Sequence, residues 1–205
     1  MLSSFIMIDS VPKIAVTHGQ AVWALWHLFD GASMPDQAFN SYVKYLRRAG
    51  IPFDSRELGV GAGTNVVYVY EHLMDLAVAL FLKSQAILRK DVVEVLAHHR
   101  DELRSIYRLA WTERETELGK PVWVRIGVKD KFRLRGVYLD LGLRYVEEGL
   151  LSITGPKALG PAGYIRAAGT QHRRQYFRDP IPLSELAIDI VKLAKAAPEI
   201  KRGRR

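Results

Sequence analysis

Cysteine is absent from the chain. Its absence excludes a disulfide framework, zinc fingers and other thiolate metal sites, and a cysteine nucleophile, and it is typical of proteins from a reducing cytoplasm. Long apolar runs are absent as well, since no stretch of about eighteen uncharged apolar residues could form a transmembrane helix. Residues 1–16 also lack the basic start and the long apolar run of a signal peptide. We therefore expect a cytoplasmic protein without a membrane segment.

The chain has an excess of positive charge, and that excess lies entirely in its second half. The 205 residues carry a formal net charge of +8. Residues 1–119 contain 12 lysines and arginines against 14 acidic residues, whereas residues 120–205 contain 18 against 8. Clustered cations gain affinity for polyphosphates by displacing counterions. The balance favours an anionic partner such as nucleic acid, although ribosomal, membrane-surface and merely soluble proteins share it.

Two helices joined by a tight turn are predicted near the N-terminus. Thr17 is placed to cap the first, which we expect over residues 18–29. The second is expected over residues 35–50, because proline is favoured at a helix start and glycine at a helix end. Ser33 or Met34 would then be the residue before its first turn.

A hairpin and two further helices are predicted next. Residues 56–60 and 65–70 are expected to form strands around the glycine turn at 61–63. Apolar residues at helical spacing then predict a helix over 71–85 and a single long helix over 91–117.

The tripeptide Gly119-Lys120-Pro121 is typical of a turn or loop that ends regular secondary structure, and we place a domain boundary there. Beyond it, periodicity and composition predict two strands, a turn-rich connector and two helices, over residues 122–126, 137–146, 155–161, 164–177 and 183–197.

Helix, tight turn, helix and glycine-tipped hairpin together form the winged-helix arrangement. A helix fits the major groove and contacts base edges there, while the hairpin reaches a neighbouring phosphate run or the minor groove. In the second helix Phe39, Val43 and Leu46 share one face, which can pack on the first helix. The opposite face carries residue types that read bases or hold phosphates, namely Gln37, Asn40, Ser41, Lys44, Arg47 and Arg48.

The hairpin favours this interpretation over an ordinary amphipathic surface helix with a solvated polar face. Gly61 and Gly63 allow a tight turn, and Thr64 and Asn65 supply short polar donors near its tip. The same glycines would also suit any surface hairpin.

The segments YVKYLRRAGIP at residues 42–52 and VYVYEHLMDL at residues 67–76, with the Gly61 turn between them, resemble MerR-type transcription regulators. The shared order is a recognition helix rich in tyrosine and arginine that ends in glycine and an aliphatic residue, then a wing, then an aromatic residue that opens the next helix. The resemblance covers roughly residues 15–118.

The resemblance implies that the second helix enters the major groove and that a long helix pairs two subunits. It assigns groove and phosphate contacts to Lys44, Tyr45, Arg47 and Arg48, wing contacts to Arg56, Thr64 and Asn65, and dimerisation to residues 91–117. The wing lacks the arginine-rich tip usual in the family. No cysteine pattern for metal sensing exists, which excludes a metal-responsive regulator.

No set of residues predicts catalysis. His98 and His99 are neighbours on a helix, so their side chains diverge by about 100° and cannot share one metal ion. The acidic pairs at 101–102 and 147–148 likewise point apart, and no phosphate loop, nucleophile elbow or zinc-protease motif is present. We expect no enzymatic activity, no metal and no cofactor.

A second basic segment lies near the C-terminus. Arg173 and Arg174 are interleaved with aromatic residues between residues 171 and 178, which could stack on bases or hold phosphates, or simply end a surface helix with favourable cations. Residues 201–205 have the composition of a basic, flexible tail that would strengthen nucleic-acid binding without sequence preference, or remain idle.

The fold class that we expect is mainly α with small β elements. A winged helix-turn-helix with a long dimerisation helix would occupy residues 1–118, a basic α/β domain residues 119–200, and a basic tail residues 201–205. The function expected is sequence-specific binding of double-stranded DNA by a cytoplasmic, nucleoid-associated, homodimeric transcription regulator. Two alternatives stay open: a partition or replication accessory protein of a plasmid or other mobile element, and an RNA-binding protein that uses the basic C-terminal half.

Overall fold

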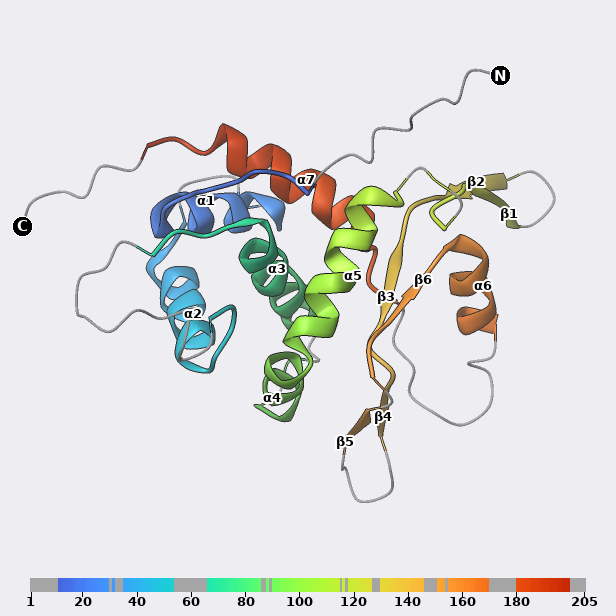
Figure 1. Cartoon of the computed structure of the whole chain (residues 1–205), viewed down its shortest axis with the longest axis horizontal. Helices are drawn as coiled ribbons and strands as arrows, with labels where there is room; N and C mark the ends of the chain where they lie inside the picture. The colour runs from blue at the N-terminus through green and yellow to red at the C-terminus, as the bar shows by residue number, and fades with distance from the viewer. Residues whose placement is uncertain are drawn as a thin grey trace, which may run out of the picture.

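The computed structural model describes residues 11–29, 31, 35–53, 66–85, 88, 90–114, 116, 118–126, 130–145, 151–153, 155–169 and 180–199. Its helices are α1 (His18–Leu28), α2 (Gln37–Arg48), α3 (Tyr70–Ser84), α4 (Lys90–His98), α5 (Arg100–Thr112), α6 (Pro161–Gly169) and α7 (Leu183–Ala196). Its strands are β1 (Val122–Ile126), β2 (Asp130–Leu134), β3 (Tyr138–Asp140), β4 (Leu143–Tyr145), β5 (Leu151–Ile153) and β6 (Lys157–Leu159). The expectation of a mainly helical chain with small antiparallel β elements is confirmed (Figure 1).

Local capping explains where the first two helices begin. The Thr17 side chain accepts a hydrogen bond from the backbone N–H of Gln20, and the Gln20 side-chain oxygen accepts one from the backbone N–H of Thr17, which completes a capping box. Asp36 caps α2 by accepting from the backbone N–H of Phe39 at 2.6 Å. The expected cap at Ser33 or Met34 is therefore wrong, because α2 begins after Asp36 rather than at Pro35.

Helix α3 forms the centre of the molecule. It is flanked by α1, α4, α5 and α7, and its residues are buried on nearly all sides. A helix that is apolar around most of its circumference is stable only when other elements enclose it. The strand predicted over 65–70 is wrong where the structure describes it, because residues 66–69 form no strand and Tyr70 already belongs to α3. Tyr68 instead forms an isolated antiparallel bridge with Val16.

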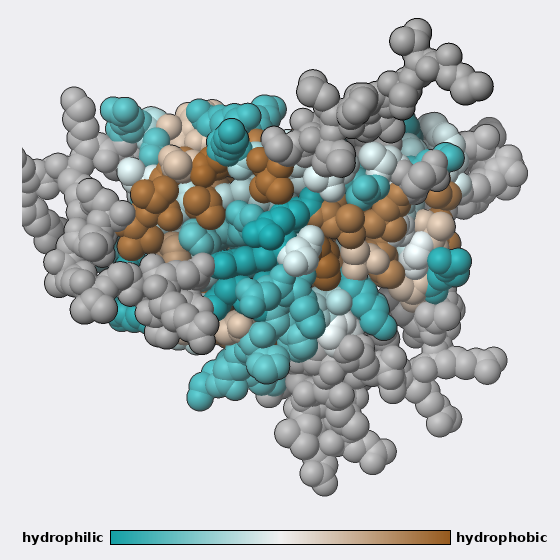
Figure 2. Space-filling view, viewed as in Figure 1, coloured by the Kyte–Doolittle hydropathy of each residue, from teal (hydrophilic) through white to brown (hydrophobic). Residues whose placement is uncertain are grey.

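The long helix expected over residues 91–117 is two helices that meet at His99. The backbone of His99 has φ −92° and ψ 21°, which leaves the helical range and bends the chain between α4 and α5 (Figure 1). The apolar sides of both helices pack inside the chain, through Val92, Val93, Leu96, Leu103, Tyr107 and Ala110. Figure 2 shows hydrophilic residues on the outer face of α4 and α5.

The described strands form three two-stranded antiparallel sheets, in which β1 pairs with β2, β3 with β6, and β4 with β5. The predicted strand over 122–126 is confirmed as β1. The strand predicted over 137–146 is interrupted at Gly142, whose φ of +61° separates β3 from β4. The expected connector over 155–161 contains β6, which pairs with β3.

The last helix returns to the N-terminal helices. Helix α7 packs against α1, α3 and α5 (Figure 1), and it buries Leu183, Leu186, Ile190, Val191 and Ala194. Residues on both sides of Gly119 thus contribute to one hydrophobic core.

Ser184 connects three elements of that core. Its Oγ donates to the Ala110 carbonyl of α5 and accepts from the Val137 N–H before β3, each at 2.8 Å. Gly136, at φ +80°, lies directly beside it: a Cβ there would lie 2.6 Å from the Cβ of Ser184.

Helix α6 begins three residues before the helix predicted over 164–177, whose residues 170–177 lie outside the described part of the chain. None of the described helices combines the length and the apolar character that crossing a membrane requires.

Candidate nucleic-acid interface

Helix α2 has one buried side and one exposed side. Val43 and Leu46 are fully buried, and the Phe39 ring meets the Trp26 ring of α1 edge-on, with centroids 5.0 Å apart. The expected packing of this apolar face on α1 is thereby confirmed. On the opposite side the side chains in contact with solvent are Gln37, Ser41, Lys44, Tyr45 and Arg48.

Asn40 and Arg47 do not belong to that exposed set, although both were expected on it. The Oδ1 atom of Asn40 lies 3.2 Å from Nε2 of His18 in α1. Arg47 is half-buried, with its guanidinium 6.0 Å from the centre of the Phe53 ring and hydrogen-bonded to the Tyr68 phenol. Both side chains therefore hold α2 against the protein.

His18 joins the two helices to the bridge at Tyr68. Its Nδ1 lies 3.0 Å from the Tyr68 hydroxyl, and its Nε2 faces Asn40. Burial raises the pKa of Tyr68, which keeps this phenol protonated and able to donate. One neutral tautomer of His18 satisfies both contacts, by accepting at Nδ1 from Tyr68 and donating at Nε2 to Asn40.

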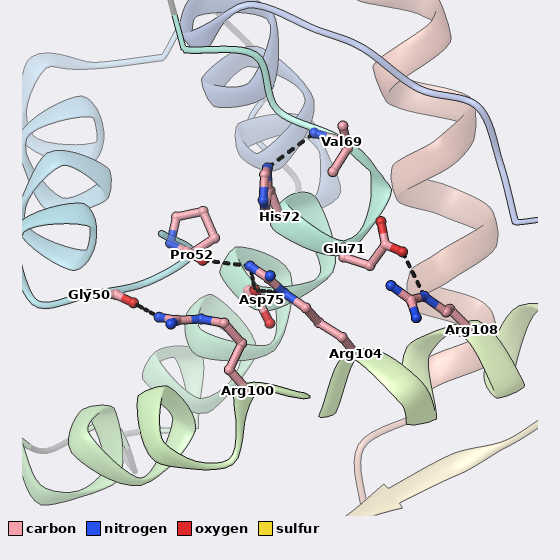
Figure 3. A network of polar contacts seen from close by, with 9 residues as sticks. All are labelled: Gly50, Pro52, Val69, Glu71, His72, Asp75, Arg100, Arg104 and Arg108. Atoms are coloured by element: carbon pink, nitrogen blue, oxygen red, sulfur yellow. Dashed lines mark hydrogen bonds and ion pairs between the residues drawn. The ribbon is translucent and has the colours of Figure 1, made fainter. Parts of the chain in front are cut away.

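Two arginines of α5 fix the turn that follows α2. Arg100 donates to the carbonyl oxygen of Gly50, and Arg104 donates to that of Pro52 at 2.7 Å (Figure 3). Charge-assisted hydrogen bonds of this kind are stronger than neutral ones. The C-terminal end of α2 is therefore anchored to the helical core.

Arg104 also forms the buried ion pair of this region, with Asp75 of α3. Its guanidinium lies 3.2 Å from the Asp75 carboxylate, and the two side chains are 14% and 7% exposed. The phenol of Tyr107 is hydrogen-bonded to the same carboxylate. A cavity of about 10 Å³ beside these residues has about the space of one water molecule. The cluster is too tightly packed to bind a substrate.

One cation next to α2 comes from a different helix. The Nζ atom of Lys83, in α3, lies 3.3 Å from the centre of the Tyr42 ring, a cation–π contact, and its side chain remains exposed. Together with Lys44 and Arg48 it adds positive charge to this side of the molecule. No motif in the sequence connects Lys83 with α2, and sequence reasoning did not find it.

Several predicted contact residues lie outside the described part of the chain. These are the wing residues Arg56, Thr64 and Asn65, and the C-terminal pair Arg173 and Arg174. Their roles stay predictions.

Comparison with known proteins gives no match to this chain, whether among family models, curated proteins or solved structures. Among the described residues, no group of three or more His, Asp or Glu side chains is placed to hold a metal ion. His99 instead lies 2.8 Å from the Glu102 carboxylate one turn along α5.

Proposed function

We propose that this protein is a sequence-specific DNA-binding transcription regulator that acts as a dimer. Helix α2 is the recognition helix of a winged helix-turn-helix, and residues 56–65 supply the wing. The observation that carries the proposal is the two-sided character of α2. Its apolar side is fixed on α1, whereas Gln37, Ser41, Lys44, Tyr45 and Arg48 are exposed together on the other.

The exposed residue types suit a duplex. Lysine and arginine contact phosphates or guanine, and glutamine, serine and tyrosine donate to bases and phosphates. Lys83 adds a cation beside the helix without belonging to it.

The rigidity of α2 supports the same role. Side chains that contact base edges bind DNA more tightly when they are already held in place, because conformational freedom that is lost on binding reduces the affinity. Asp36 caps the start of the helix, His18 and Asn40 hold its first turn against α1, and the turn after its end is fixed by Arg100 and Arg104. Because α2 is already held in place in the free protein, little conformational entropy would be lost when it enters the groove.

The dimeric state comes from the resemblance to MerR-type regulators. A two-fold dimer would place two copies of α2 in successive major grooves, about one helical turn of DNA apart. Because α4 and α5 use their apolar sides within the chain, subunit contacts through these helices would involve their hydrophilic outer face.

Selection from a random library of duplex DNA tests the proposal. The full-length protein is incubated with the library at physiological salt, and bound fragments are amplified and sequenced over several rounds. We expect enrichment of one motif composed of two inverted half-sites about ten base pairs apart. Fragments that show no enrichment over the input library would overturn sequence-specific recognition, and a single half-site would overturn the dimer.

The same motif distinguishes a regulator from a partition or replication accessory protein. Binding sites mapped in cells are expected at promoters for a regulator. Clustered copies of the motif at one locus would instead assign the protein to plasmid or chromosome maintenance.

A further inference from the structure

The β1–β2 ribbon presents a tryptophan to solvent. Trp123 is 65% exposed. Burying a large aromatic side chain normally stabilises a protein, and an exposed ring becomes a candidate binding surface when a cation lies next to it on the same face. In Figure 1 the ribbon and α2 lie at opposite ends of the molecule, so this surface is separate from the proposed duplex site.

Arginine lies directly across the ribbon from this tryptophan. In the antiparallel register Trp123 of β1 faces Arg133 of β2, and the Arg133 side chain is exposed. Side chains at directly opposed positions share one face of a sheet, with Cβ atoms about 5 Å apart. A flat aromatic ring and a guanidinium are thus neighbours on the same face.

Further cations surround the base of the ribbon. The Gly136 N–H donates to the Gly119 carbonyl at 2.9 Å, which brings the flanking residues Lys120 and Arg135 to the same place. Both are exposed. Gly160 meets the backbone of Leu118 closely, so the start of α6 lies against this base as well.

Among the described side chains of this part of the chain, cations outnumber carboxylates. Between residues 118 and 167 the described side chains include the exposed cations Lys120, Arg133, Arg135, Lys157 and Arg166. The single carboxylate among those described side chains is that of Asp140, which is half-buried and accepts from the Gly142 N–H at 2.8 Å. Of these cations, Arg133 is placed beside Trp123 by the strand register, and Lys120 and Arg135 are placed at the base of the ribbon by the Gly136–Gly119 hydrogen bond.

We propose that the β1–β2 ribbon binds single-stranded nucleic acid, with an unpaired base stacked on Trp123 and the backbone phosphates held by Arg133 and the neighbouring cations. The bases of a duplex are already stacked on each other, so only an unpaired base can lie on the ring. Aromatic stacking next to cations is the usual way in which single strands are bound without strict sequence preference.

This inference is independent of the proposed role of α2. It concerns single-stranded rather than double-stranded nucleic acid, and the β1–β2 ribbon rather than α2. Substitutions in the ribbon should therefore weaken binding to single strands only. Substitutions in α2 should weaken binding to duplexes only.

The test measures binding of fluorescently labelled oligonucleotides by anisotropy with the full-length protein at fixed salt. One mixed-sequence strand is used as single-stranded DNA, as single-stranded RNA, and as DNA duplex. We expect Trp123→Ala to weaken single-strand binding on the order of ten-fold and to leave duplex binding unchanged. Trp123→Phe should retain most of the affinity, since phenylalanine keeps an aromatic face.

Two further variants separate stacking from charge. Arg133→Gln should weaken single-strand binding and lower the slope of log affinity against log salt by about 0.7. Ile188→Ala, which removes an exposed apolar side chain from α7, is the control and should change nothing. Equal affinity for the DNA and RNA strands would indicate that base and phosphate suffice, and preference for RNA would add a 2′-hydroxyl contact; either result is compatible with the proposal.

The proposal is overturned if Trp123→Ala binds single strands as tightly as the unmodified protein. It is equally overturned if this variant loses self-association in sedimentation while its single-strand affinity is unchanged, because Trp123 would then belong to a subunit interface. Unchanged melting temperatures of the Trp123 variants show that any lost affinity is local.

Discussion

Arg104 of α5 and Asp75 of α3 form a buried ion pair, with the guanidinium 3.2 Å from the carboxylate. The same guanidinium donates to the Pro52 carbonyl in the turn after α2 (Figure 3). A buried charge is tolerated only when a partner and hydrogen bonds compensate its desolvation. The pair therefore links the stability of the core to the position of the proposed recognition helix.

Removal of Arg104 should destabilise the fold strongly. Arg104→Ala leaves the Asp75 carboxylate buried without its cation, which is expected to lower the free energy of unfolding by about 3–5 kcal/mol. Arg108→Ala is the matched control on the same helix, because Arg108 pairs with Glu71 while 55% exposed, and it should cost less than about 1 kcal/mol. Urea denaturation followed by circular dichroism measures both. Equal losses in the two variants would contradict a special role for the buried pair.

Alkaline pH should destabilise the protein through two buried tyrosines. Burial raises the pKa of Tyr107 well above the ordinary value of 10.0, and it raises the pKa of Tyr70 as well. Above pH 10 the unfolded chain loses protons that the folded chain retains, so the free energy of unfolding falls as pH rises. The expected slope is about 1.4 kcal/mol per pH unit for each tyrosine, and it is absent below pH 10.

Denaturation curves at a series of alkaline pH values measure that slope. Tyr70→Phe should reduce it, because one titrating group is removed while the ring is kept. Tyr70 donates its hydroxyl to the Tyr107 carbonyl at 2.9 Å, so the variant also loses one hydrogen bond, worth about 1 kcal/mol at every pH. A slope identical to that of the unmodified protein would show that Tyr70 does not contribute.

Two glycines with similar backbone angles should respond differently to alanine. Gly136 has φ +80° and Gly155 has φ +94°, so alanine at either position costs about 1–2 kcal/mol of backbone strain. A Cβ at Gly136 would also lie 2.6 Å from Ser184, whereas nothing lies within 4 Å of one at Gly155. Gly136→Ala should therefore destabilise more than Gly155→Ala by at least about 1 kcal/mol. Thermal unfolding of the two variants compares them directly, and equal shifts would refute the close packing at Ser184.

Helix positions were largely predictable because the signals that set them are local. The helix expected over 18–29 is α1, that over 71–85 is α3, and that over 183–197 is α7, each within one residue at either end. Capping groups lie three residues from the N–H groups that they satisfy, and apolar spacing repeats within a turn. The bend at His99 escaped prediction because Leu96 and Leu103 are seven residues apart, which keeps them on one face in a straight helix and in this bent one.

Contacts between distant parts of the chain could not be predicted from spacing. The periodicity of α7 shows that it buries one side but does not name α1, α3 and α5 as its partners. Asn40 has the position and polarity of an outward residue, and only His18, 22 positions earlier, explains why it packs inward. Lys83 lies at the candidate interface because its side chain contacts the Tyr42 ring of α2, and no local sequence pattern predicts a contact between these two helices.

The exposed cations of α2 should contribute to duplex binding in a way that charge alone does not explain. Lys44→Ala and Arg48→Ala each remove one exposed cation from the proposed recognition helix. Lys192→Ala removes the same charge from the exposed side of α7 and serves as the control. If α2 lies in the groove, the two α2 variants should lose about 1–3 kcal/mol of binding free energy on the selected operator, while the control keeps its affinity.

The salt dependence then assigns each side chain to phosphate or base. A cation that holds a phosphate lowers the slope of log affinity against log salt by about 0.9 when it is removed, for all sequences alike. A cation that contacts a base edge leaves the loss specific to the operator and relaxes selectivity at one position. Because both side chains are exposed, the variants should melt at the temperature of the unmodified protein. Equal losses for Lys44→Ala, Arg48→Ala and Lys192→Ala would mean that net charge alone attracts the duplex, and α2 would no longer be its recognition helix.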